Sequence, residues 1–337
     1  MSEGWDVSRR GSLALRAYGA LVATTCVACG ETAECADAVE LSSGAVLRFA
    51  ALGDTGTGNA RQQQVAAALA ATCARDGCDF VLLLGDNFYD HGVGGVDDPQ
   101  WSSKFEGPYA SVPAPFFAVL GNHDYGGGGA GLDDARGQAQ VDYAERSARW
   151  NMPGRCYALR TPVATLVGLD TNRVLWERPG ALRGQGSYAA RELERPGWRI
   201  AFGHHPYRSN GTHGHAGAYQ GRRWPAMASG DSVRTLFEQY LCGRLDLYLS
   251  GHDHSRQVLP PSDHCDATLV VTGAGARTTA LPGDGPMLFG AATLGFVYVT
   301  VSSDRLTVQT MDASGQVDFE TDVMRAGSAA ASWPQAL

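Results

Sequence analysis

The sequence has almost no lysine: Lys104 is the single one among 337 residues, so the positive charge of the chain rests on arginine. Lysine and arginine together number 27 against 35 aspartates and glutamates, which gives a formal net charge of -8. An acidic chain without a dense arginine patch lacks the electrostatic footprint of a nucleic-acid-binding surface. We therefore expect no nucleic-acid partner.

Long hydrophobic runs are also missing. The apolar stretch at residues 17–28 is too short to span a bilayer. It follows Arg9 and Arg10, and small residues precede Cys26 and Cys29, which is typical of an export signal. The arginine pair also fits a twin-arginine signal in part, and Cys29 or Cys26 is a candidate site for a lipid anchor. We expect an exported protein that is periplasmic, extracellular or lipid-anchored at the cell envelope.

Composition suggests the domain boundaries. We expect an export signal at residues 1–29, a linker of small and polar residues at 30–45, one domain at 46–324 and a disordered tail at 325–337. With 44% hydrophobic residues the chain can bury a full core, and strand signals are spread evenly along it. One large domain, which we expect to be a monomer, therefore fits better than two.

Cysteine is scarce, with eight residues, and no cysteine stands beside a candidate ligand. Without the first 29 residues an even set of six remains, which favours disulfides in an oxidising compartment. Cys73 and Cys78 can close a small loop, and Cys242 with Cys265 can brace a nearby strand. For Cys156 the sequence leaves a disulfide and a buried free thiol equally open.

Five short apolar runs, each typical of a buried strand, are followed at once by potential metal ligands. The runs are residues 47–52, 79–84, 115–120, 198–202 and 245–249. The ligands that follow them are Asp54, Asp86 and Tyr89, Asn122, His204, and His252 with His254. Because ligands follow the carboxyl ends of strands in α/β folds, we expect these side chains at one common edge.

Other elements follow from periodicity and turn residues. Asn59 is expected to cap a helix that ends near Cys73, and a second helix is expected over residues 231–241. We expect a helix at residues 143–150, an irregular loop at 173–186 and a mobile glycine-rich rim at 126–129. Further strands are expected at residues 164–169, 269–272, 296–302, 305–311 and 316–319.

The ligand set consists of oxygen and nitrogen donors without a thiolate. Seven donors are more than one metal ion needs and suit two ions. Asn122 is neutral, so it fits a divalent ion better than a trivalent one.

The motifs resemble those of the purple acid phosphatases, of the small tartrate-resistant type, within the calcineurin-like metallophosphoesterases. The chain carries Gly53-Asp54-Thr55-Gly56, Gly85 to Tyr89, Gly121 to Asp124, Ala201 to His204 and Gly251 to His254 in the order of that family. One motif departs, since Ala201 stands where the family usually has valine. The resemblance runs from about Val46 to about Val299. It implies a four-layer α/β/β/α sandwich of two mixed sheets flanked by helices, with a dinuclear metal site at the carboxyl ends of the strands.

The resemblance also implies roles for individual residues. Asp54, Tyr89 and His254 would bind a ferric ion; Asn122, His204 and His252 would bind a divalent ion of iron, zinc or manganese; Asp86 would bridge the two. Tyr89 separates this family from most metallophosphoesterases, which place a histidine where this chain has Gly56. His123 would protonate the leaving group with Asp124 as its orienting partner, and His213 is the second candidate for this role.

The function implied is hydrolysis of small phosphate monoesters by a hydroxide that bridges the two ions, as in an acid phosphatase. Two alternatives stay open. The same metal platform could serve a phosphodiesterase or nucleotide hydrolase, or the chain could be an inactive exported metal-binding protein.

Overall fold

The computed structural model describes residues 35–223 and 225–326. The expected export signal and its cysteines lie outside the described residues. Among the described residues, no helix combines the length and the apolar character needed to cross a membrane.

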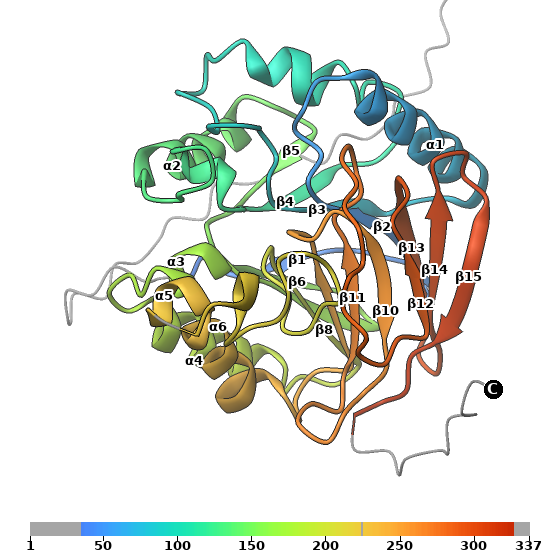
Figure 1. Cartoon of the computed structure of the whole chain (residues 1–337). Helices are drawn as coiled ribbons and strands as arrows, with labels where there is room; N and C mark the ends of the chain where they lie inside the picture. The colour runs from blue at the N-terminus through green and yellow to red at the C-terminus, as the bar shows by residue number, and fades with distance from the viewer. Residues whose placement is uncertain (1–34, 224, 327–337) are drawn as a thin grey trace, which may run out of the picture. The chain divides into compact units, whose positions relative to one another are not determined.

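Two mixed sheets form the centre of the domain (Figure 1). The first sheet has the described strands, in spatial order, β1 (Val39–Glu40), β6 (Tyr157–Arg160), β7 (Ala164–Gly168), β8 (Trp198–Phe202), β9 (Leu247–Ser250), β11 (Thr268–Thr272), β10 (Arg256–Leu259) and β12 (Phe289–Ala291). The second has β15 (Val317–Asp322), β14 (Leu306–Asp312), β13 (Gly295–Val301), β2 (Leu47–Leu52), β3 (Phe80–Leu84), β4 (Phe116–Val119) and β5 (Trp150–Asn151).

The parallel part of each sheet carries the expected ligand strands. Strands β2, β3, β4 and β5 are parallel neighbours in the second sheet. Strands β7, β8, β9 and β11 are parallel neighbours in the first. Their side chains are buried on both faces, which explains the continuous apolar runs in the sequence.

Three apolar clusters define the four expected layers. Facing side chains of the two sheets, such as Leu82 and Ile200, form the central cluster. On the outer face of the second sheet, α1 (Ala60–Asp76) and the short helix Trp101–Glu106 pack against the strands. On the outer face of the first sheet, α3 (Thr171–Leu175), α4 (Ala181–Glu192) and α6 (Asp231–Leu236) do the same. The four-layer sandwich is confirmed.

Two further helices complete the described secondary structure. Helix α2 (Asp134–Asp142) follows the glycine-rich segment, and α5 (Ala226–Ser229) precedes α6. Helix α6 continues as a wider turn over Phe237–Leu241, so the expected helix at 231–241 is confirmed. Asn59 caps α1 as expected, because its Oδ1 accepts the amide protons of Arg61 and Gln62 at 3.0 and 3.1 Å.

Two local predictions are wrong. The helix expected at residues 143–150 lasts only from Tyr143 to Glu145, and the buried Trp150 pairs with Phe116 of β4 instead. The expected irregular loop at residues 173–186 contains the end of α3 and the start of α4. Its glycines serve packing: a Cβ at Gly186 would lie 2.6 Å from the ring of Tyr240, so only glycine lets the two helical segments approach this closely.

Three disulfides are present among the described cysteines. Cys73–Cys78 and Cys242–Cys265 confirm the expected pairs. Cys156 bonds to Cys35, which settles the alternative left open by the sequence in favour of a disulfide. That bond and the pairing of β1 with β6 attach residues 35–40 to the domain, where the sequence suggested a linker.

The expected tail also begins with attached residues. Arg325 donates to the carbonyl of Gly197 at 2.9 Å, and its guanidinium carbon lies 4.1 Å from the ring centroid of Trp198. The remainder of the tail lies outside the described residues.

Candidate metal centre

The carboxyl ends of strands from both sheets meet at one edge. Asp54, Asp86, Tyr89 and Asn122 follow β2, β3 and β4, while His204, His252 and His254 follow β8 and β9. The amide of Gly53 donates to the carbonyl of Thr272 at 2.8 Å, which links the two sheets at this edge. The expected convergence of the seven side chains is therefore found.

Glycine in these motifs allows the turns to touch. Gly85 has a φ of +85°, and a Cβ there would lie 2.6 Å from the amide nitrogen of Gly121 and 2.7 Å from Nδ1 of His204. At Gly251 a Cβ would lie 2.6 Å from Oδ2 of Asp54. Any side chain at these positions would push the ligand turns apart.

One half of the cluster is built around Asp54. The Tyr89 hydroxyl donates to Oδ1 of Asp54 at 2.8 Å and lies 3.0 Å from Nε2 of His254. The same His254 nitrogen is 3.4 Å from Oδ1 of Asp54. The backbone amide of His252 donates to the other carboxylate oxygen at 2.8 Å, which fixes its orientation.

The other half is built around His204. Its Nδ1 lies 2.9 Å from the carbonyl of Leu84, which can only accept, so Nδ1 carries a proton. Its Nε2 faces three potential ligand atoms: Oδ1 of Asn122 at 2.9 Å, Nδ1 of His252 at 3.1 Å and Oδ1 of Asp86 at 3.5 Å. Because the carboxylate and amide oxygens carry no proton, these atoms need a proton or a cation between them.

The charges of the cluster also call for a cation. Asp54 and Asp86 are buried, and among the described residues their ion pairs are with histidines, not with arginine or lysine. Burial opposes ionisation of Asp54, but its contacts with His254 lower the pKa of this carboxyl. Burial and then the charge of Asp54 raise the pKa of Tyr89 well above its ordinary value. Ionising this phenol beside two carboxylates therefore requires added positive charge, and the oxygen and nitrogen donor set fits metal ions.

Gly56 and Tyr89 are structurally linked. The amide of Tyr89 donates to the carbonyl of Gly56 at 2.8 Å, which ties the first two motifs together. A Cβ at Gly56 would lie 2.1 Å from the carbonyl oxygen of Asn87. The backbone that delivers Tyr89 therefore leaves no room at position 56 for a side chain such as histidine.

His123 lies at the rim of the cluster. Its backbone amide donates to Oδ1 of Asp86 at 2.9 Å, and its Nδ1 lies 2.9 Å from the carbonyl oxygen of Asp90. Since that carbonyl only accepts, Nδ1 carries a proton and Nε2, 4.0 Å from Oδ2 of Asp86, faces the cluster. His123 thus presents a titratable nitrogen beside the candidate ligands.

Asp124 does not have this position. Its buried carboxylate accepts the amide protons of Gly121, Asn87 and Phe88 at 2.8, 3.1 and 3.0 Å. Burial, followed by the charge of Asp86, raises its pKa to about 6. Asp124 therefore joins the second and third motif turns, and the Asp90 carbonyl, rather than Asp124, contacts the His123 ring.

The ring of His213 lies next to the ring of the candidate ligand His252. Its ring centroid is 4.2 Å from that of His252, and its backbone amide donates to Oδ1 of Asp253 at 2.7 Å. The other oxygen of Asp253 accepts from the Ser209 hydroxyl. Asp253 lies between the ligands His252 and His254 and is buried, so it couples the ligand turn to the loop that carries His213.

Sequence reasoning overlooked several neighbours of the cluster. Asp253 was visible only as the third residue of the motif Gly-His-Asp-His. The guanidinium carbon of Arg277 lies 3.7 Å from the ring centroid of Tyr89, and Arg277 pairs with Asp90 at 2.9 Å. Lys104 donates to the carbonyl of Tyr89. No local sequence motif predicts that these two cations lie near Tyr89, because only the folding of the chain brings them there.

His205 also lies beside the cluster, although it is not among the residues predicted as ligands. One of its ring nitrogens is among the potential ligand atoms grouped with those of His204 and His252, which all lie within 4.8 Å of one another. Its Nδ1 lies 2.9 Å from the Thr171 hydroxyl. The repeated histidine at 204 and 205 was the available signal.

A protein-family model covers the part of the chain that carries this geometry. The model of the calcineurin-like phosphoesterases matches residues 47–256, a span that contains all seven candidate ligands. The chain belongs to this family. As a family member it is a metallophosphoesterase, and the clustered aspartates and histidines are candidates for its dimetal site.

Individual relatives show which members of the family the chain resembles. The chain is 30% identical to human tartrate-resistant acid phosphatase type 5 over 316 residues, which cover 83% of this chain and 91% of the relative. It is 28% identical to purple acid phosphatase 3 of Arabidopsis thaliana, covering 80% of this chain and 75% of the relative. The metallophosphoesterase therefore resembles the purple acid phosphatases over most of its length.

Solved structures share the fold. One is described as GAP50, the anchor in the inner membrane complex of Plasmodium, with a TM-score of 0.65 and 23% identity, covering 82% of this chain and 88% of that one. Another is the purple acid phosphatase PPD1 from yellow lupin seeds, with a TM-score of 0.60 and 18% identity, covering 84% of this chain and 54% of that one. At these identities the likeness concerns the fold alone.

Proposed function

We propose that this metallophosphoesterase is an exported acid phosphatase that hydrolyses small phosphate monoesters at an Fe(III)–M(II) centre. Tyr89 is the observation that carries the proposal. A phenolate is a hard anionic ligand, which favours trivalent iron, and Tyr89 lies where its hydroxyl contacts both Asp54 and His254. The 30% identity with human tartrate-resistant acid phosphatase supports the same assignment.

In this proposal Asp54, Tyr89 and His254 would hold the ferric ion, and Asn122, His204 and His252 would hold a divalent ion of iron, zinc or manganese. Asp86 would be shared by the two ions, since it contacts His204 on one side and its turn carries Tyr89 on the other. When bound, the ions supply an activated water as nucleophile and positive charge for the phosphate.

The remaining residues donate protons or hold the ligand turns in position. His123 donates a proton from Nε2 to the leaving oxygen, because Nδ1 is already committed to the Asp90 carbonyl at 2.9 Å. His213, held by Asp253, is the second candidate donor. Asp124 keeps the second and third motif turns together rather than acting on the substrate.

Export of the protein is supported by three disulfides among the described residues, since such bonds form in oxidising compartments. Whether a lipid is attached at Cys29 or Cys26 is tested by mass spectrometry of the purified envelope fraction.

Metal analysis combined with an absorption spectrum and a pH profile tests the proposed function. We expect iron with a second metal, a visible absorption band, and hydrolysis of p-nitrophenyl phosphate that is fastest at mildly acidic pH. A colourless protein with two zinc ions would refute the iron assignment. Faster hydrolysis of bis(p-nitrophenyl) phosphate would make the protein a phosphodiesterase, and no turnover of either ester would leave an inactive metal-binding protein.

A further inference from the structure

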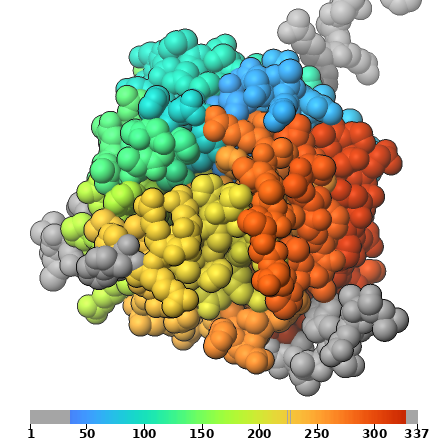
Figure 2. Space-filling view, viewed as in Figure 1, coloured from blue at the N-terminus to red at the C-terminus, as the bar shows by residue number. Residues whose placement is uncertain are grey.

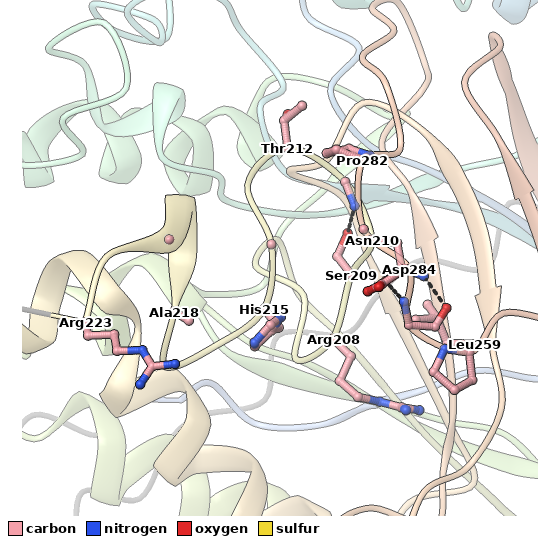
Figure 3. A pocket seen from close by; sticks show the side chains of 16 residues that line it. Arg208, Ser209, Asn210, Thr212, His215, Ala218, Arg223, Leu259, Pro282 and Asp284 are labelled. Atoms are coloured by element: carbon pink, nitrogen blue, oxygen red, sulfur yellow. Dashed lines mark hydrogen bonds between the residues drawn. The ribbon is translucent and has the colours of Figure 1, made fainter.

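A pocket of about 650 Å³ lies beside the loop that carries His213 (Figure 3). Among its described lining residues none is a candidate metal ligand, so the pocket does not belong to the metal centre. Two cations from distant parts of the chain do contact that centre, because Lys104 and Arg277 both touch Tyr89. Arg277 lies against the ring of Tyr89, whereas Lys104 binds the backbone of that residue.

The guanidinium of Arg277 contacts two consecutive residues. Its carbon lies 3.7 Å from the ring centroid of Tyr89, and its Nη2 donates to Oδ1 of Asp90 at 2.9 Å. The side chain of Arg277 is 36% exposed and that of Asp90 is 60% exposed, so solvent screens this ion pair. Such a pair contributes little to stability, and replacing Arg277 should leave the fold intact. The consequence of the two contacts is therefore the position of residues 89 and 90.

Backbone contacts fix the loop that carries Arg277. On one side of it, the amide of Gly275 donates to the carbonyl of Gly53 at 3.2 Å, and a Cβ at Gly275 would lie 2.6 Å from that carbonyl oxygen. On the other side, the amide of Thr279 donates to the carbonyl of His254 at 2.8 Å. In Figure 2 orange surface from the later part of the chain borders blue and cyan surface from its first third. The loop is thus tied to the first and to the last ligand motif.

Residues 89 and 90 in turn carry two groups that bear on the metal centre. Tyr89 presents its hydroxyl to the candidate ligands, and the carbonyl oxygen of Asp90 lies 2.9 Å from Nδ1 of His123. The rings of Tyr89 and His123 are also neighbours, with centroids 4.6 Å apart. Lys104 donates to the carbonyl of Tyr89, in the peptide that joins the two residues. Because a carbonyl turns only with its backbone, holding Asp90 also holds the ring of His123.

We propose that Arg277 is a positioning residue of the metal centre, which holds residues 89 and 90 so that the Tyr89 phenol faces the candidate ligands and the His123 ring faces the substrate. The inference rests on the proposed function, in which His123 protonates the leaving oxygen, and adds the residue that orients both side chains. Arginine is always charged in proteins, and a cation over an aromatic ring stabilises the electrons of that ring. Arg277 therefore acts on Tyr89 through its charge as well as through its position.

The absorption spectrum tests the contact with Tyr89. In the proposed ferric site the visible band arises when charge moves out of the phenolate ring, and a cation over the ring makes this transfer more costly. Arg277→Met should therefore shift the band to longer wavelength, and Arg277→Lys, which keeps the charge, should shift it less. Arg191→Met is the matched control and should leave the band unchanged. The guanidinium carbon of Arg191 lies 5.1 Å from the ring centroid of Tyr188, and its Nε lies 3.6 Å from Glu192, but none of these residues is a candidate ligand.

The dependence of the rate on the leaving group tests the contact with His123. Arg277→Met should lower kcat for alkyl phosphates about tenfold, as expected when a residue that supports a site is replaced. The kcat for p-nitrophenyl phosphate should fall much less, because a good leaving group needs little help from a proton donor. Asp90→Ala, which removes the partner of Arg277, should show the same difference between the two esters. In the His123→Ala background Arg277→Met should add little further loss, and Arg191→Met should change neither rate.

An unmoved absorption band in Arg277→Met would overturn the proposal, as would equal losses for alkyl and aryl esters. If the wild-type protein shows no visible band, the iron assignment fails and the comparison of leaving groups still decides the role of Arg277. If it hydrolyses neither ester, the proposed function fails, and nitrogen NMR of the His123 ring in the zinc-loaded protein decides instead. The wild-type ring should carry its proton on Nδ1 and lose this single form in Arg277→Met, whereas an unchanged His123 signal would refute the positioning role. If Arg277→Met does not fold, Asp90→Ala provides the same comparison of leaving groups and the same NMR readout.

Discussion

Single side chains at the metal centre have separable tasks. Tyr89 touches Asp54 and His254, whereas His123 faces the cluster from the rim and makes its ring contact with the Asp90 carbonyl. A ligand and a proton donor should therefore fail in different ways when they are replaced.

Tyr89→Phe should abolish the visible absorption and retain part of the hydrolysis. The substitution keeps the ring volume and removes the oxygen that would bind the ferric ion, but it leaves the nucleophile to the metal ions. Absorption spectra and p-nitrophenyl phosphate assays on the same sample measure both effects. Tyr109→Phe, another buried tyrosine, is the control and should keep the colour. Persistent colour in Tyr89→Phe would remove this residue from the ferric site.

His123→Ala should show the opposite pattern, with the colour kept and the rate lowered. Loss of general acid help usually costs ~10²- to 10⁴-fold, and the loss should be largest for substrates with poor leaving groups. The measurement is kcat for alkyl and aryl phosphates. His91→Ala serves as control, because that exposed histidine accepts a hydrogen bond from the Gly128 amide outside the ligand cluster. Full activity of His123→Ala on alkyl phosphates would exclude the residue from proton transfer.

At the scale of elements, the site depends on contacts between the loop that carries His213 and the ligand turn that carries Asp253. Asp253 bonds to Ser209 and to the amide of His213, and a Cβ at Gly211 would lie 2.3 Å from its Oδ1. The loop thus closes around the carboxylate so tightly that position 211 requires a residue without a side chain.

Asp253→Asn should lower the rate through His213 rather than through the metal ions. The amide removes the charge that holds the loop, so His213 loses its fixed position over His252. We expect losses of about tenfold in Asp253→Asn and in His213→Ala, and little further loss in the double variant. Metal content and absorption spectrum are the accompanying readouts. Additive losses, or loss of one metal in Asp253→Asn, would assign the residue to ligand support instead.

Elements also show what the sequence could and could not predict. The ligand strands were predictable because each combines an apolar run with a glycine and a ligand, as in residues 80–86. Helix α4 was missed because its glycines resemble a loop, whereas Gly186 serves contact with Tyr240. Asp253 and Arg277 could not be predicted, since their importance arises from partners distant in sequence, such as Tyr89 for Arg277.

At the scale of the whole molecule, we expect the protein without residues 1–29 to fold and bind metal like the full chain. All candidate ligands and the three described disulfides lie within residues 35–326. Circular dichroism, thermal unfolding and metal analysis of both forms provide the comparison. A matched form that starts after residue 36 lacks Cys35 and its bond to Cys156, and should unfold at lower temperature. Loss of soluble protein on removal of residues 1–29 would show that they belong to the folded domain.

Because the chain has a single lysine, a protease can be used to probe the region of the metal centre. An enzyme that cleaves after lysine has one site in the chain, at Lys104, whose ammonium group is bound to the Tyr89 carbonyl and to Gln100. Cleavage of the native protein would therefore report local opening beside Tyr89, and metal binding should slow it. Because the Cys35–Cys156 bond joins the two products, they would separate on an electrophoresis gel only after reduction.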